Sequence, residues 1–259
     1  MLYYLTDWLV RSGNKFPGSA LFQFISSRVL IAVILSLVIS AVFGKRMIRI
    51  LRNRQVAESV RDLGLAGEQK KKGTPTMGGF IIILAILVPT LLLADLNKVY
   101  IRLMIFATLW LGLIGFIDDY LKLRAKQQSQ RKGEAYRKGN SDGLAGWFKV
   151  SGQIVLGVVV AAVLLFNENT RIWREYSGPV KAGDLSIKQN VIDGKEKKFV
   201  VAGEPVTTIP FVKGHEFNYA KLLPEVARSW SWLFYMVIVV FIITAVSNGA
   251  NITDGLDGL

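Results

Sequence analysis

The chain has 259 residues, of which 51% are hydrophobic and none is cysteine, and its formal net charge is +13. The lack of cysteine in this sequence excludes a disulfide framework and cysteine metal sites. The mean hydropathy is +0.37, and the apolar residues are concentrated in blocks of about 20, the length that spans a bilayer. These features exclude a soluble globule and predict an all-α polytopic integral membrane protein with about five transmembrane helices.

We expect a single membrane domain over residues 1–259, with spans at residues 22–43, 77–96, 99–120, 148–166 and 229–247. Residues 1–21 contain Asp7, Arg11 and Lys15, so they lack the continuous apolar core of a signal peptide. Leu2, Leu5 and Trp8 recur at helical spacing in this segment. The segment therefore either lies along the membrane interface or packs on neighbouring helices.

The polar segment 44–76 carries nine basic and three acidic residues, an excess typical of the cytoplasmic side of a membrane. It ends in the sequence GTPTMGG at residues 73–79, directly after three lysines. Glycines let the backbone approach a ligand closely, and free N–H groups at a helix start attract phosphate. This stretch is therefore a candidate phosphate-binding element. The alternative is a loop-to-helix turn that binds no ligand.

Two adjacent carboxylates, Asp118 and Asp119, stand at the end of the third predicted span. A charged side chain at the bilayer centre costs about 2.5–3.5 kcal/mol on insertion scales, and neighbouring acids repel each other. A site at the membrane–water boundary that holds a hard divalent cation explains the pair; acids that only mark a helix end are the alternative. Lys122 follows Asp118 at i+4, so it either faces the same site or forms a surface ion pair.

The segment 121–149 is again rich in basic residues, among them Lys149, which also favours the cytoplasmic side. The segment 167–228 has ten basic and eight acidic residues, a near balance that favours an extracytoplasmic loop. Alternating apolar residues at 198–201 and 207–212 predict a small β-hairpin within this loop.

The last predicted span leads to the sequence NITDGLDGL at residues 251–259. Asn251, Asp254 and Asp257 recur every three residues, which places them near one face of a helical turn. Their oxygen and amide groups suit a cation, ribose hydroxyls or a uracil edge. Helix capping explains a single aspartate but not three polar groups in register.

Three stretches together, KKGTPTMGG at 71–79, GFIDDYLK at 115–122 and NITDGLDGL at 251–259, closely resemble the phospho-N-acetylmuramoyl-pentapeptide-transferase family. This family belongs to the polyprenyl-phosphate N-acetylhexosamine-1-phosphate transferase superfamily. The aspartate pair is shared across the superfamily, whereas the GTPTMGG stretch indicates the muramoyl-pentapeptide branch. The resemblance extends over nearly the whole chain outside the segment 167–228.

The resemblance implies transfer of phospho-MurNAc-pentapeptide from UDP-MurNAc-pentapeptide to undecaprenyl phosphate, giving lipid I and UMP, with Mg²⁺ as cofactor. It also implies a homodimer in the bacterial inner membrane, with the site facing the cytoplasm and no nucleic-acid partner. By resemblance, the catalytic residues are Asp118, Asp119 and Asp257, with Asp118 and Asp119 also at the metal. The substrate-binding residues implied are Lys71, Thr76, Lys122, Lys149, Asn251 and Asp254.

The family pattern continues beyond the motif at 251–259, through about five more spans that carry a further aspartate motif and a histidine-rich loop. We therefore expect this chain to match an N-terminal portion of the family and to be inactive alone. Two alternatives stay open at this point. One is a sister transferase that uses UDP-GlcNAc, and the other is a non-catalytic membrane protein such as a transporter or scaffold, because intramembrane acids also occur in ion pathways.

Overall fold

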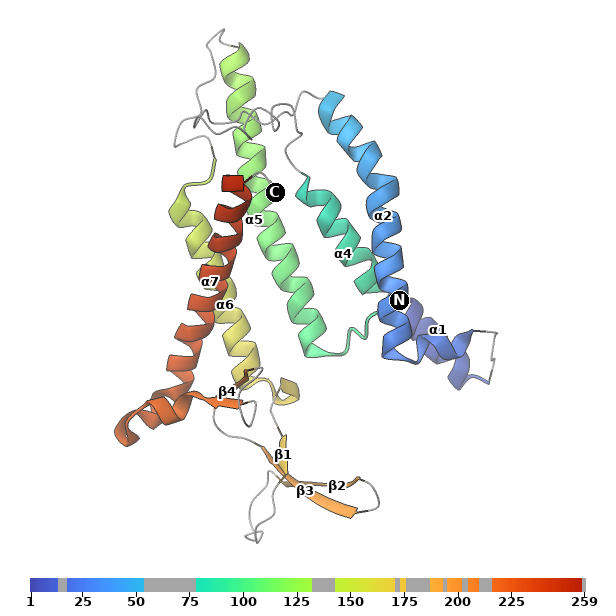
Figure 1. Ribbon diagram of the computed structural model, residues 1–259, viewed down its shortest axis with the longest axis vertical. Coiled ribbons are helices and arrows are strands. Elements are labelled where there is room, and N and C mark those ends of the chain that lie inside the picture. Colours follow the sequence, from blue (N-terminus) through green and yellow to red (C-terminus); the bar gives the residue numbers. More distant parts are fainter. Residues whose placement is uncertain are drawn as a thin grey trace. The chain divides into compact units, whose positions relative to one another are not determined.

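The computed structural model describes residues 1–13, 18–53, 78–131, 143–170, 173–175, 187–192, 195–201, 205–209 and 216–257 (Figure 1). Its long elements are helices, which lie at α1 (Leu2–Arg11), α2 (Ile25–Asn53), α4 (Gly79–Leu93), α5 (Val99–Arg131), α6 (Gly146–Phe166) and α7 (Ser231–Asp257).

Four helical stretches within the described residues are long and apolar enough to cross a membrane: Ile25–Ile50, Val99–Ala125, Gly146–Phe166 and Glu225–Asn251. The apolar helix α4 has 15 residues and is about 22 Å long, shorter than the roughly 30 Å hydrocarbon core. Large apolar side chains such as Leu37 and Phe241 are two-thirds exposed on these helices, as expected of surfaces that face lipid. The predicted class, an all-α polytopic integral membrane protein, is confirmed.

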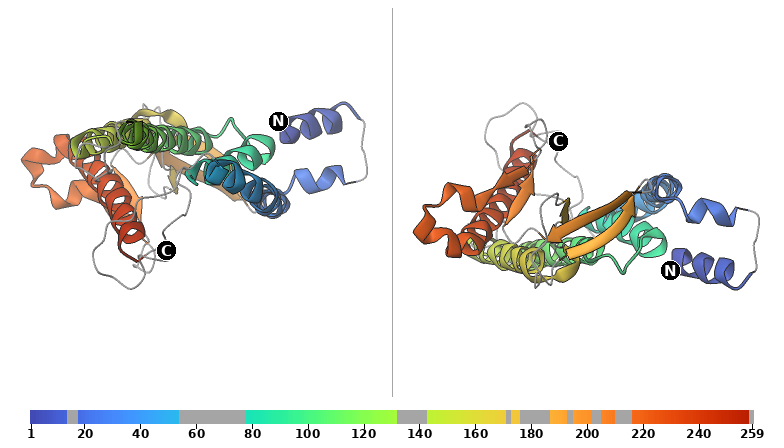
Figure 2. Two further views of the ribbon diagram at one scale, coloured as in Figure 1. Left: turned by 90° about the horizontal axis from the view of Figure 1, so that it is seen from above. Right: turned by 90° about the horizontal axis from the view of Figure 1, so that it is seen from below.

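The chain divides into two compact units, Met1–Gln153 with Ser247–Leu259, and Ile154–Val246. In the first unit, α2 packs along α4, and α4 packs against α5. The short 3₁₀ helix η1 (Ser19–Phe22) folds back beside α1 (Figure 2). The first unit therefore contains both α5, which carries the aspartate pair, and the last turns of α7.

Helix α1 packs on the turn between α4 and α5, so the second of the two expectations for residues 1–21 matches the contacts. The Tyr4 hydroxyl donates to Asp95 Oδ1 at 3.0 Å and accepts from the backbone N–H of Asn97 at 3.0 Å. Arg28 lies over the Tyr3 ring, 4.3 Å from its centroid, and donates to the Leu93 carbonyl at 3.4 Å. These contacts give the Arg28 charge polar and aromatic partners inside an apolar helix.

The second unit contains the β structure of the segment 167–228. Strands β1 (Trp173–Glu175), β3 (Lys195–Val201) and β2 (Ile187–Ile192) form an antiparallel sheet in the order β1-β3-β2. Strand β4 (Val206–Thr208) pairs with β5 (Glu216–Asn218). A small β-hairpin is present, but the predicted pairing of 198–201 with 207–212 is wrong. Residue 199 pairs with Glu175 and Lys188 instead, because β3 lies between β1 and β2 in the sheet.

The β4–β5 pair is held to the beginning of α7 by aromatic contacts within the second unit. Tyr219, which is 7% exposed, lies edge-on to Phe217, Phe234 and Tyr235 at centroid distances of 5.1, 6.3 and 5.5 Å. Its hydroxyl also hydrogen-bonds Thr207 Oγ1 at 3.0 Å. Edge-to-face rings stabilise such a cluster beyond the area that they bury.

Candidate functional site

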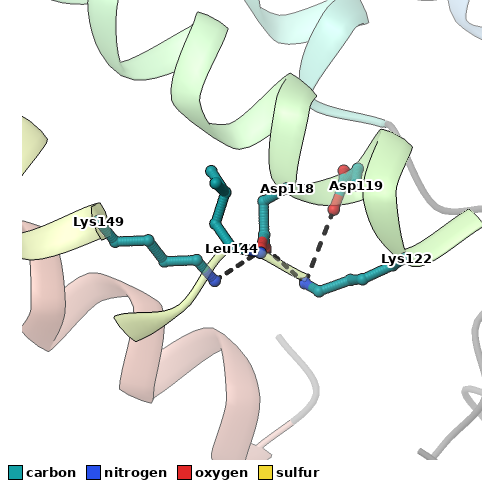
Figure 3. A network of polar contacts seen from close by, with 5 residues as sticks. All are labelled: Asp118, Asp119, Lys122, Leu144 and Lys149. Atoms are coloured by element: carbon teal, nitrogen blue, oxygen red, sulfur yellow. Dashed lines mark hydrogen bonds and ion pairs between the residues drawn. The ribbon is translucent and has the colours of Figure 1, made fainter. Parts of the chain in front are cut away.

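The Asp118 carboxylate is the centre of the polar network in the first unit (Figure 3). The residue is 6% exposed on α5. Its Oδ2 accepts from Lys122 Nζ at 2.6 Å and from Lys149 Nζ at 2.8 Å. Its Oδ1 accepts from the backbone N–H of Leu144 at 2.8 Å. Both carboxylate oxygens therefore have charged or polar donors, as a buried anion requires.

Lys122 reaches Asp118 because residues four apart on a helix lie on the same face. Its ammonium also lies 3.9 Å from Asp119 Oδ1. The Lys122 side chain is 42% exposed and that of Asp119 34%, so these two groups border solvent while Asp118 is covered. Lys122 therefore both pairs with Asp118 and faces the same site as the second aspartate, which combines the two expectations from the sequence.

Lys149 comes from the first turn of α6, 31 residues beyond Asp118. Its side chain is 32% exposed. The ion pair joins the start of α6 to the middle of α5, and two ammonium groups compensate one buried carboxylate. With Asp119 beside Lys122, the group contains two ammonium groups and two carboxylates, so its formal charges balance.

The turn that precedes α6 completes the network through its backbone. A Cβ added at Gly143 would lie 2.5 Å from Asp118 Oδ1 and 3.0 Å from Lys122 Cε. No side chain fits there, so glycine lets the backbone approach closely enough for the Leu144 N–H to reach the carboxylate. The sequence analysis missed Gly143 and Leu144, because a backbone donor leaves no residue-type signal.

A second polar link joins α6 to α7 one helical turn after Lys149. Gln153, which is 7% exposed, donates from Nε2 to Ser247 Oγ at 3.0 Å. Its Oε1 accepts from Asn248 Nδ2 at 2.8 Å. The sequence analysis also missed these three residues. The signal that marks them is a polar triple inside two otherwise apolar spans.

The remaining predicted site residues divide into two groups. Asn251, Asp254 and Asp257 lie on the last turns of α7, in the same unit as Asp118. Asn251 is exposed, whereas only the backbone is described for Asp254 and Asp257. Lys71 and Thr76 lie outside the described residues. The structure thus brings Asp118, Asp119, Lys122 and Lys149 together and leaves the contacts of the other five residues unassigned.

The side chains around Asp118 can be compared with those that a metal ion requires. Among the described residues, no group of three or more His, Cys, Asp or Glu side chains could hold a metal ion. The carboxylates of Asp118 and Asp119 are hard oxygen ligands of the kind that Mg²⁺ prefers, together with water. Asp119 fits that role better, because its side chain borders solvent whereas that of Asp118 is covered. Asp118 would have to exchange a lysine for the metal.

No family profile matches the chain. Curated relatives, by contrast, match all of it. The chain is 46% identical over 268 aligned positions to a phospho-N-acetylmuramoyl-pentapeptide-transferase of Flavobacterium johnsoniae, of which it covers 60%. It is 43% identical to the Parabacteroides distasonis protein of the same name, of which it covers 57%, and 44% identical to that of Amoebophilus asiaticus, of which it covers 59%.

The chain therefore spans about 60% of the length of the curated relatives that it matches, and the match includes the segments that carry the aspartate pair and its lysines. The resemblance seen in the three motifs is confirmed: over its whole length, this chain is homologous to the phospho-N-acetylmuramoyl-pentapeptide-transferases.

Proposed function

We propose that the protein transfers phospho-MurNAc-pentapeptide from UDP-MurNAc-pentapeptide to undecaprenyl phosphate, giving lipid I and UMP for peptidoglycan synthesis. The observation that carries this proposal is the buried Asp118 with two ammonium partners, in a chain whose relatives bear that transferase name over its full length. A sister enzyme that uses UDP-GlcNAc is the second candidate, since the aspartate pair alone does not distinguish them.

In the proposed reaction, an oxygen of undecaprenyl phosphate attacks the phosphorus bound to the sugar. The new P–O bond joins sugar phosphate to lipid phosphate, and the bond between the two phosphates of the donor breaks, so that UMP leaves with the electron pair. Both reactants are anionic, so the site must reduce their repulsion and stabilise the charge shared by attacking and leaving oxygens.

In the proposal, Lys122 and Lys149 reduce the repulsion between the two anionic substrates and stabilise the charge on the attacking and leaving oxygens. The Lys122 and Lys149 side chains are 42% and 32% exposed, so a phosphate oxygen can approach them while Asp118 holds the cations in place. Asp119 borders solvent beside Lys122, and we assign it to orient or deprotonate the lipid phosphate. A covalent aspartyl route and a direct attack are both compatible with this arrangement.

Mg²⁺ belongs to the proposal as the cofactor, and Asp119 together with Asp118 would hold it. Bound there, it would act as a Lewis acid on phosphoryl oxygens. Lys71, Thr76, Asn251 and Asp254 are proposed to bind the donor, and Asp257 to complete the catalytic acids. All of these are positions in the two motifs that flank the described network.

The proposed setting is the inner membrane of a bacterium, with the Asp118 network facing the cytoplasm. The basic excess of the segments 44–76 and 121–149 supports this orientation, since cytoplasmic loops are enriched in lysine and arginine. A homodimer is proposed from the resemblance alone.

The test uses protein expressed from the complete coding sequence that contains these 259 residues. UMP release is measured with undecaprenyl phosphate and either UDP-MurNAc-pentapeptide or UDP-GlcNAc, with and without Mg²⁺. We expect Mg²⁺-dependent release from the muramoyl donor only. Release from UDP-GlcNAc alone would favour the sister transferase, and no release from either donor would favour a non-catalytic membrane protein. The 259 residues expressed alone should release no UMP.

A further inference from the structure

The amide of Gln153 is a buried polar group between two apolar helices, and both of its ends are used. Nε2 donates to Ser247 Oγ at 3.0 Å, and Oε1 accepts from Asn248 Nδ2 at 2.8 Å. With 7% of the residue exposed, neither end relies on water. One side chain on α6 thus holds two successive residues of α7.

The hydrogen bonds of Gln153 lie close to candidate site residues on both helices. Gln153 lies four residues after Lys149 on α6, and residues four apart share a helix face. Ser247 and Asn248 lie four and three residues before Asn251 on α7. The bridge therefore stands one turn from Lys149 on one helix and one turn from the Asn251–Asp257 segment on the other.

A membrane gives such a bridge more influence on geometry than on stability. Lipid tails are as apolar as leucine, so helices in a bilayer have little hydrophobic drive to adopt one register. Packing and interhelical hydrogen bonds set the register instead. Two hydrogen bonds from one amide fix both the rotation of α7 and its axial position against α6, because a slip of one residue would lose both bonds.

We infer that Gln153 is a positioning residue, which holds Asn251, Asp254 and Asp257 in register with Lys149 through its bonds to Ser247 and Asn248. The inference rests on the proposed function, in which Asn251 and Asp254 bind the uridine donor and Asp257 belongs to the catalytic acids. Gln153 itself touches neither substrate. Its loss should therefore weaken donor binding without removing a reacting group.

The kinetic test replaces Gln153 by leucine, which keeps the approximate volume and removes both hydrogen bonds. We expect KM for UDP-MurNAc-pentapeptide to rise about tenfold, with a smaller change in kcat, because mispositioned binding groups lower affinity. Ser151→Ala is the matched control, since Ser151 lies on the same helix and donates to the Phe148 carbonyl within that helix. Ser247→Ala should have a partial effect that largely disappears in the Gln153→Leu background.

The structural test does not depend on activity. The chain has no cysteine, so Trp147→Cys and Ala250→Cys allow two spin labels at exposed positions of α6 and α7. We expect the distance distribution between the labels to broaden or shift in Gln153→Leu and to stay unchanged in Ser151→Ala.

The two tests separate the inference from the proposed function. An unchanged distribution, or an unchanged KM in an active Gln153→Leu enzyme, would overturn the inference while leaving the transferase assignment intact. If the wild-type protein makes no lipid I, the proposed function is overturned. The link between Gln153 and donor binding is then overturned as well, even if the spin-label distances still depend on Gln153.

Discussion

Lys149 Nζ lies 2.8 Å from Asp118 Oδ2 although 31 residues separate them in the chain. The pair joins the first turn of α6 to the buried carboxylate of α5, and Lys122 approaches the same oxygen from within α5 at 2.6 Å. One aspartate thereby sets the positions of two cations. This relationship makes Asp118 an organiser of positive charge, and the predictions below follow from it.

The ion pair between Lys149 and Asp118 is expected to stabilise the folded protein. Lys149→Met removes the cation that links α6 to α5, so we expect a loss of about 1–3 kcal/mol in stability, as when a buried acceptor loses a charged donor. Lys221→Met, at an exposed position of the second unit, is the control and should leave the unfolding midpoint unchanged. The measurement is thermal unfolding in detergent at constant pH. A midpoint for Lys149→Met equal to that of the control would contradict the role of this ion pair.

Gly143→Ala tests the close approach of the backbone to Asp118. The added Cβ would lie 2.5 Å from Asp118 Oδ1, so either the turn or the Asp118 carboxylate must move, and the hydrogen bond from the Leu144 N–H is disturbed in both cases. We expect transferase activity to fall by about tenfold or more, since a misplacement of about 1 Å in a site can cost two orders of magnitude. Gly146→Ala is the matched control, because a Cβ there meets nothing within 4 Å. Equal activities in the two variants would contradict the packing described for Gly143.

Helices α5 and α6 are also joined within the apolar region by Trp110. Its Nε1 donates to the Gly152 carbonyl at 2.9 Å. Trp110→Phe retains an aromatic ring and removes the donor, so we expect a loss of about 0.5–1.5 kcal/mol. Trp147→Phe, at a residue that is 66% exposed, should have little effect. The two unfolding midpoints in the same detergent give the comparison, and a larger loss in Trp147→Phe would contradict it.

The sequence alone predicted the helices because long apolar blocks carry a strong and local signal. Each of the five expected spans overlaps a helix, although α5 extends beyond the expected end at residue 120 to Arg131, since polar residues continue a helix outside the membrane. A strand over residues 198–201 was also predicted from alternation, and the observed strand is Lys195–Val201. Its partners were not, because a local pattern does not show which strands pair.

The candidate site was predicted in part, for a related reason. Asp118, Asp119 and Lys122 are neighbours on one helix, so their spacing places them together. Lys149 was added by resemblance, and the structure gives it a contact with Asp118. Gly143, Leu144 and Gln153 were missed, because their roles depend on backbone position and on packing between helices. Neither property is encoded in the type of a single residue.

The measurement that tests the account most directly compares Asp118→Asn with Asp119→Asn in lipid I synthesis by protein from the complete coding sequence. Asparagine at 118 keeps the size but removes the charge that holds Lys122 and Lys149. We expect lipid I formation to fall by at least about 100-fold, on the scale of losing preorganised charge stabilisation. Asp119→Asn should raise the Mg²⁺ concentration needed for activity and should also lower the rate at saturating Mg²⁺, because it removes the group assigned to the lipid phosphate. If the folded Asp118→Asn protein keeps near wild-type activity, the buried aspartate does not organise the site.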